Sequence, residues 1–215
     1  MHVLPVINCA STACVTKKLE TLKTFSPRVK RVHIDVGEKP VSRIRIPFFP
    51  GILTRYAKQF VFEVHYMVGE KKFFSSAHAS RGTVRVWYPF EQIRNMSAFE
   101  RGIQTFKRKK IDVGVAIRVG TKVSSISLPK GVRHVLLLAV LPGPAGQTFD
   151  TRAFMLISFL RKNYPRVILT VDGGITPVLA RKLIARGVSR VTSAGYIWEN
   201  KNPHKAYQEL VHSDT

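Results

Sequence analysis

Short apolar runs alternate with longer amphipathic stretches along the whole chain. The apolar runs are rich in Val, Ile, Leu and aromatic residues, which is typical of strands that are buried on both faces. The pattern predicts eight strands: Val3–Asn8, Arg31–Val36, Phe60–Val68, Thr83–Trp87, Asp112–Ile117, Val135–Val140, Val167–Val171 and Arg190–Ser193.

The stretches between these runs have helical periodicity. They predict helices over Thr16–Phe25, Gly51–Lys58, Lys71–Ala79, Ser97–Lys109, Thr151–Asn163, Pro177–Arg186 and Pro203–Val211. Thr176 precedes a proline in the first turn, as an N-cap should, and Ser97 and Asp150 are the expected caps of two other helices. Between the fifth and sixth strands the helical pattern is weak, and Pro129 would end any helix there.

Eight strands alternating with about eight helical segments predict an α/β fold. We expect a (β/α)₈ TIM barrel that forms a single compact domain over residues 1–215. That length is at the small end of the range of about 200 to 400 residues for this fold. A doubly wound open sheet is the alternative, but no G-x-G-x-x-G turn follows the first strand.

The composition is strongly basic. The chain has 35 Lys and Arg against 13 Asp and Glu, for a net charge of +22, and 45% of its residues are hydrophobic. The apolar fraction indicates a folded protein rather than a disordered basic tail. The basic residues are spread along the chain, and only residues 107–110 form a dense run. Nucleic acid is therefore expected as a partner only through non-specific charge.

Membrane insertion and a disulfide framework are both unexpected. The longest strongly apolar stretch, Val135–Leu141, has seven residues, whereas a membrane-spanning helix needs about 20. The first residues lack the pattern of a signal peptide. Cys9 and Cys14 are the only cysteines, too few for a disulfide scaffold or a four-cysteine zinc site. We therefore expect a cytoplasmic protein with reduced thiols.

Polar side chains occur near the ends of three predicted strands. His33 and Asp35 lie near the end of the second strand, His65 near the end of the third, and Asp172 ends the seventh. Alternation along a strand puts His33 and Asp35 on the same face, and functional residues of a barrel lie at the carboxyl ends of its strands. The sequence therefore predicts that two imidazoles and two carboxylates converge.

Such a set of ligands suits a divalent cation of zinc, iron, manganese or cobalt. The two carboxylates could also act as a base and an acid on a substrate carbon, with the metal stabilising an enediolate. Taken alone, His33 or His65 is more often a satisfied buried residue. The remaining histidines are expected at the surface or in packing roles: His2, His78, His134, His204 and His212.

Two glycine-rich stretches follow the sixth and seventh strands. The first contains Gly143, Pro144, Ala145 and Gly146, and the second is Gly173–Gly174. Turns of this kind present backbone N–H groups that can hold a phosphate in this fold.

These segments, in this order, resemble the ribulose-phosphate 3-epimerase family. The similar stretches are VHIDV (32–36), EVHYMV (63–68), GVAIRVGT (114–121), VLPGPAGQTF (140–149) and VDGGI (171–175). The resemblance covers most of the chain. It implies a (β/α)₈ barrel that interconverts D-ribulose 5-phosphate and D-xylulose 5-phosphate.

The resemblance also assigns roles to residues. It implies that His33, Asp35, His65 and Asp172 are metal ligands, that Asp35 and Asp172 are the proton acceptor and donor, and that His65 contacts substrate. It further implies that Asp172 binds substrate. The other implied substrate-binding residues are Gly143, Pro144, Ala145, Gly146, Gly173, Gly174, Ala194 and Gly195. The implied partners are a sugar-phosphate substrate and further copies of the chain in a homo-oligomer.

The rim of the predicted site departs from the family pattern. Val6 stands where the family has a serine, Pro144 removes a backbone donor, and Ala194–Gly195 replaces Gly-Ser. Two alternatives therefore remain open. One is epimerisation of another ketose phosphate, such as a 6-phosphohexulose, and the other is a non-catalytic basic barrel that binds RNA or another polyanion.

Overall fold

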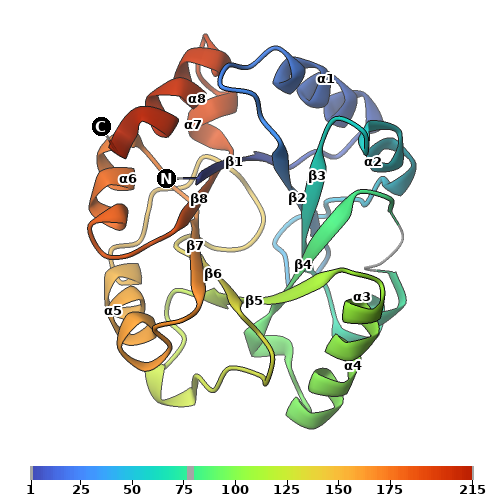
Figure 1. Cartoon of the computed structure of the whole chain (residues 1–215), viewed down its shortest axis with the longest axis vertical. Coiled ribbons are helices and arrows are strands. Elements are labelled where there is room, and N and C mark those ends of the chain that lie inside the picture. Colours follow the sequence, from blue (N-terminus) through green and yellow to red (C-terminus); the bar gives the residue numbers. More distant parts are fainter. Residues whose placement is uncertain (1, 77–79, 215) are drawn as a thin grey trace.

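Eight parallel strands form a closed barrel in sequence order, with β1 paired to both β2 and β8 (Figure 1). The computed structural model describes residues 2–76 and 80–214. The strands are β1 His2–Ile7, β2 Arg31–Gly37, β3 Val61–Met67, β4 Thr83–Pro89, β5 Asp112–Arg118, β6 His134–Leu138, β7 Ile168–Asp172 and β8 Arg190–Ser193. All eight predicted strands are confirmed, and the closed barrel excludes the doubly wound sheet.

Helices surround the barrel (Figure 1). The main hydrophobic core is formed by buried side chains of the strands and of these helices. The helices are α1 Thr12–Lys23, α2 Pro50–Tyr56, α3 Glu70–Ser76, α4 Met96–Arg108, α5 Ala153–Asn163, α6 Pro177–Ile184, α7 Gly195–Trp198 and α8 Pro203–Val211. Each predicted helix has an observed counterpart, and α7 was not predicted. The predicted end of the third helix, Ala79, lies outside the described residues, as does His78.

Two of the three predicted helix caps are wrong. Thr176 caps α6, since its hydroxyl accepts from Leu179 N. Asn95, not Ser97, caps α4 by accepting from Ala98 N. Asp150 accepts instead from Arg152, the residue before α5. The sequence predicts the wrong starting residue for α4 and α5 because several residues near each start could act as a cap. It does not show which of them has the extended backbone that a cap requires.

The interior of the barrel is filled by side chains rather than being a pore. Trp87, Ala116, Leu136 and Leu138 form a buried cluster there. Gly114 makes room for the indole, because a Cβ at this position would lie 2.4 Å from the Trp87 ring. This plug separates the two ends of the barrel, so each end can carry its own chemistry.

The two cysteines are bonded to each other, which corrects the expectation of reduced thiols. The Cys9–Cys14 disulfide joins the loop after β1 to the first turn of α1. The sequence did not predict this bond, because a single pair of cysteines five residues apart does not have the spacing pattern of a disulfide-rich protein. Among the described residues, no helix has the length and apolarity needed to cross a bilayer.

Candidate active site at the carboxyl end of the barrel

Three of the four predicted ligands meet at the carboxyl ends of β2 and β3. His33 Nε2 and His65 Nδ1 each lie 3.3 Å from the same atom, Asp35 Oδ1. The register of the two strands places Asp35 directly beside His65, and alternation along β2 puts His33 on the same face. All three side chains are buried.

The contacts within this group shift its titration. Burial alone would raise the pKa of Asp35, but its polar contacts with His33 and His65, and their charge, hold that pKa well below its usual range. Burial alone would lower the pKa of His33, but the contact with Asp35 raises it overall. The carboxylate of Asp35 and the imidazole of His33 therefore stabilise one another's charged forms.

Asp172, the fourth predicted ligand, lies at the end of β7 in the same cavity. Its Oδ1 accepts a hydrogen bond of 2.5 Å from Thr192 Oγ1 on β8. Burial and the negative charge of Asp35 raise the pKa of Asp172. The two buried carboxyl groups thus differ in proton affinity, although they share one site.

The His33–Asp35–His65 group suits a divalent cation. Its ligand atoms lie within 4.8 Å of one another. Both nitrogens of each imidazole and Asp35 Oδ1 are buried without a hydrogen-bond partner among the described residues. Buried polar atoms normally have partners. Two ligands held about 2 Å from a tetrahedral ion lie about 3.3 Å apart, which agrees with the two observed contacts.

A cavity of about 350 Å³ opens above these side chains at the carboxyl end of the barrel. It is lined by Asp35, His65 and Asp172, and His33 lies beneath them. Every other residue predicted to touch substrate also lines it: Gly143, Pro144, Ala145, Gly146, Gly173, Gly174, Ala194 and Gly195. The residues predicted to touch substrate therefore line one continuous cavity.

The turn after β7 requires both of its glycines. Gly173 and Gly174 have φ values of 101° and 66°. A Cβ on Gly174 would lie 2.3 Å from Phe149 N, and a Cβ on Gly173 would lie 2.4 Å from a Val140 methyl group. The turn therefore packs directly against the loop after β6, and the backbone groups of both segments border the cavity.

Asn8 is a site residue that the sequence reasoning missed. It follows β1, and its side chain donates to Gly143 O at 2.7 Å and to Asp35 Oδ2 at 3.3 Å. It therefore ties a carboxyl group of the site to the loop after β6. A polar residue at the end of the first strand was the available signal.

The cavity is acidic although the protein is strongly basic. Asp35, Asp172 and Glu199 line it, and no Lys or Arg is found among the described lining residues. Glu199, which follows α7, approaches the loop closely, since a Cβ on Gly146 would lie 3.0 Å from its Oε1. Lys18, on α1, lies over the Trp198 ring. Burial lowers its pKa, and the charges of Asp35 and Glu199 partly offset that effect.

The fold and the site together define a (β/α)₈-barrel enzyme with its ionisable groups at the carboxyl ends of the strands. The sequence model of the ribulose-phosphate 3 epimerase family matches residues 2–198. The chain belongs to this family of isomerases, and the resemblance read from the sequence is confirmed.

Curated relatives agree with this membership at low identity. Ribulose-phosphate 3-epimerase of Helicobacter pylori is 26% identical over 217 residues, covering 98% of this chain and 96% of the relative. The cytoplasmic isoform of the rice enzyme (Oryza sativa subsp. japonica) is 26% identical over 162 residues, covering 74% and 70%.

Solved structures with the same fold are more distant in sequence. 3-Hexulose-6-phosphate synthase from Salmonella typhimurium matches with a TM-score of 0.72 and 14% identity, covering 100% of this chain and 98% of that one. N-(5'-phosphoribosyl)anthranilate isomerase from Pyrococcus furiosus matches with a TM-score of 0.62 and 18% identity, covering 100% and 98%. At these identities the likeness concerns the fold.

Proposed function

We propose that this protein interconverts D-ribulose 5-phosphate and D-xylulose 5-phosphate by moving a proton at C3. The observation that carries the proposal is that Asp35, His65 and Asp172 line one cavity, with His33 beside Asp35, in a chain of the ribulose-phosphate 3-epimerase family. Inverting a carbon through proton transfer needs one group to take the proton and another to return it on the opposite side.

The positions of Asp35 and Asp172 support these two roles. They project from β2 and β7, which are separated in the barrel by β8 and β1, so a substrate between them has a carboxyl group on either side. In the proposed reaction Asp35 takes the C3 proton and Asp172 returns one to the other face. The opposite directions of their pKa shifts agree with this division.

His33, Asp35 and His65 would hold a divalent cation, and Asp172 completes the proposed ligand set. When bound, zinc, iron, manganese or cobalt would supply a Lewis acid for the negative charge that develops on the substrate oxygens. Thr192 holds Asp172 in place, and Asn8 holds Asp35. His65, which borders the cavity, also contacts the substrate in this proposal.

Backbone groups would bind the substrate phosphate. Three backbone segments that line the cavity could supply these groups: Gly143–Gly146, Gly173–Gly174 and Ala194–Gly195. The absence of Lys and Arg from the described lining leaves backbone N–H groups as the main donors there. The carboxylate of Glu199 lies close to Gly146 and Gly195, so its negative charge would weaken phosphate binding by repulsion.

The test combines metal content with activity. We expect the purified protein to bind about one divalent cation per chain, and expect Asp35→Asn to lose the cation and the activity. Asp172→Asn is expected to abolish turnover while leaving the fold intact. Asp150→Asn, which alters an exposed pair with Arg152, is the matched control and should retain both. Full turnover by either site variant would refute the proposed roles.

A second candidate substrate is a 6-phosphohexulose. The rim residues Val6, Pro144 and Gly195 differ from the family pattern, and they border the part of the cavity that would receive the substrate chain. Turnover of a 6-phosphohexulose, with none of D-ribulose 5-phosphate, would select this candidate and leave the proton-transfer roles unchanged.

A further inference from the structure

A second ionic cluster is buried at the opposite, amino-terminal end of the barrel. Glu63 on β3 is fully buried. Its Oε1 accepts from three guanidinium groups, those of Arg31 at 2.9 Å, Arg85 at 2.5 Å and Arg190 at 3.2 Å. None of these four residues lines the catalytic cavity, so the proposed epimerisation makes no use of them.

This cluster has more positive than negative charge. Asp112 is the one other carboxylate that contacts it among the described residues, 3.2 Å from Arg85 Nη2, and its side chain is 58% exposed. His134 contacts the same Arg85 atom, and burial, with the charges of Arg85 and Arg190, lowers its pKa to about 4, so it is neutral at pH 7. Three guanidinium groups therefore face two carboxylates. Buried charge of this kind requires a counter-charge.

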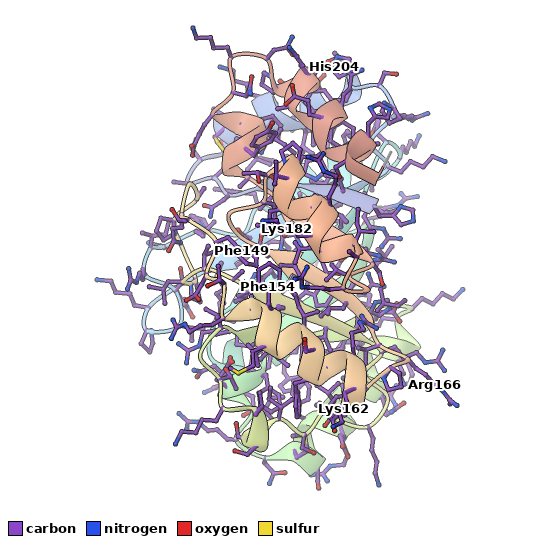
Figure 2. The ribbon with its side chains drawn as sticks, turned by 90° about the vertical axis from the view of Figure 1, so that its left-hand side faces the viewer. Phe149, Phe154, Lys162, Arg166, Lys182 and His204 are labelled. Carbon is purple, nitrogen blue, oxygen red and sulfur yellow. A yellow bond between two sulfur atoms is a disulfide. The ribbon has the colours of Figure 1, made fainter. Side chains whose placement is uncertain are left out.

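The unbalanced cluster borders an open cleft. A cleft of about 740 Å³ lies at this end of the barrel, and Arg31 and Arg190 form part of its wall. Arg28, Lys30 and Lys58 line it as well, and no acidic residue is found among the described lining residues. Arg166, which precedes β7, marks this end at the right of Figure 2, and Phe149, after β6, lies toward the other end.

We propose that this cleft binds a small ligand that carries two or more linked phosphate groups. Five cationic side chains and no acidic residue are found in the described lining of the cleft, which matches an oligophosphate chain. Guanidinium groups bind phosphate through paired N–H donors. The cleft has the volume of a small-molecule site, which suits a compact anion better than a nucleic-acid strand. The inference does not depend on the reaction at the other end of the barrel.

The test uses inorganic tripolyphosphate and ATP as probes, titrated calorimetrically at physiological ionic strength. Arg190→Gln is the direct variant, but it disturbs the buried cluster and could impair folding. The test therefore rests on the double variant R28Q/K58Q, whose two side chains are exposed at the rim. The matched control is K162Q/K182Q, which removes the same charge from the exposed faces of α5 and α6 (Figure 2).

We expect one tripolyphosphate per chain, with binding weakened about tenfold or more in R28Q/K58Q and little changed in the control. Tighter binding of ATP would indicate a nucleotide, and equal binding an oligophosphate chain alone; both support the proposal. No binding, equal weakening in both double variants, or binding of many ions per chain would overturn it. So would a short RNA whose binding is lost in R28Q/K58Q while tripolyphosphate binding is unaffected.

Discussion

A single side chain, Asn8, connects two parts of the proposed active site. Its amide donates both to Asp35 and to the loop after β6, so it fixes the proposed base relative to that loop. We expect Asn8→Ala to lower kcat by about tenfold with a small change in KM, because one hydrogen bond that orients the base is lost.

Asn163→Ala serves as the control for Asn8→Ala, since Asn163 donates to Phe159 O within α5 and is not among the described residues that line the cavity. Steady-state kinetics of the three proteins provide the measurement. An unchanged kcat in Asn8→Ala would show that Asp35 does not need this support.

Glu199 places a carboxylate beside the expected phosphate position. We expect Glu199→Gln to lower KM for D-ribulose 5-phosphate by about threefold to tenfold, because a like charge is removed, and to leave kcat unchanged. Unphosphorylated D-ribulose is the internal control, and its KM should not fall. Equal changes for both sugars would place the effect elsewhere than at the phosphate.

We expect His134 to make the folded protein less stable in acid. Its pKa is lowered to about 4 in the folded protein by burial first and then by Arg85 and Arg190, whereas its ordinary value is about 6.5. Between these values the unfolded chain binds a proton that the folded chain does not. Stability therefore falls as pH decreases through this range.

We expect wild-type protein to lose about 1 to 2 kcal/mol more unfolding free energy between pH 7 and pH 5 than His134→Gln does. Denaturant unfolding at the two pH values measures this difference. An equal loss in both proteins would assign the acid sensitivity to other groups.

Among the elements, β3 contributes one ionisable side chain to the cluster at each end of the barrel. His65 belongs to the carboxyl-end site, and Glu63, two residues earlier on the same face, holds the arginine cluster. We expect Glu63→Gln to lower the free energy of unfolding by about 3 to 5 kcal/mol, because three guanidinium groups then lose their shared buried carboxylate.

Asp112→Asn is the matched variant for Glu63→Gln, because it removes an exposed partner of the same Arg85. It should cost about 1 kcal/mol or less. Comparable losses in the two variants would contradict the importance assigned to burial. Chemical denaturation of both proteins supplies the comparison.

The elements themselves were readable from the sequence because their hydrophobic patterns are strong. The strand ends carrying His33, Asp35, His65 and Asp172 followed from alternation and from the rule that barrel sites lie at carboxyl ends. The short helix α7 gave too few residues for a period, and the cluster around Glu63 depends on contacts between β2, β3, β4 and β8. These contacts join residues that are 22 to 127 positions apart in the sequence. The hydrophobic pattern of one segment cannot predict such contacts, so the sequence did not indicate that His134 contacts Arg85.

At the scale of the whole molecule, the residues that give the net charge of +22 are unevenly distributed between the two ends of the barrel. The carboxyl-end cavity is lined by carboxylates, whereas the amino-terminal cleft is lined by Arg and Lys. The two ends are separated by the cluster around Trp87. The basic composition therefore belongs mainly to the outer surface and the amino-terminal cleft rather than to the catalytic cavity. Homo-oligomer formation and a cytoplasmic location stay predictions.

The central claim is that Asp35 and Asp172 exchange the hydrogen at C3 of a ketose phosphate. The most direct measurement is proton NMR of D-ribulose 5-phosphate in D₂O with the metal-replete protein. We predict that the C3 hydrogen is replaced by deuterium as D-xylulose 5-phosphate appears, and that Asp35→Asn shows neither change. A metal-replete, folded wild-type protein that leaves the C3 hydrogen in place would contradict the account.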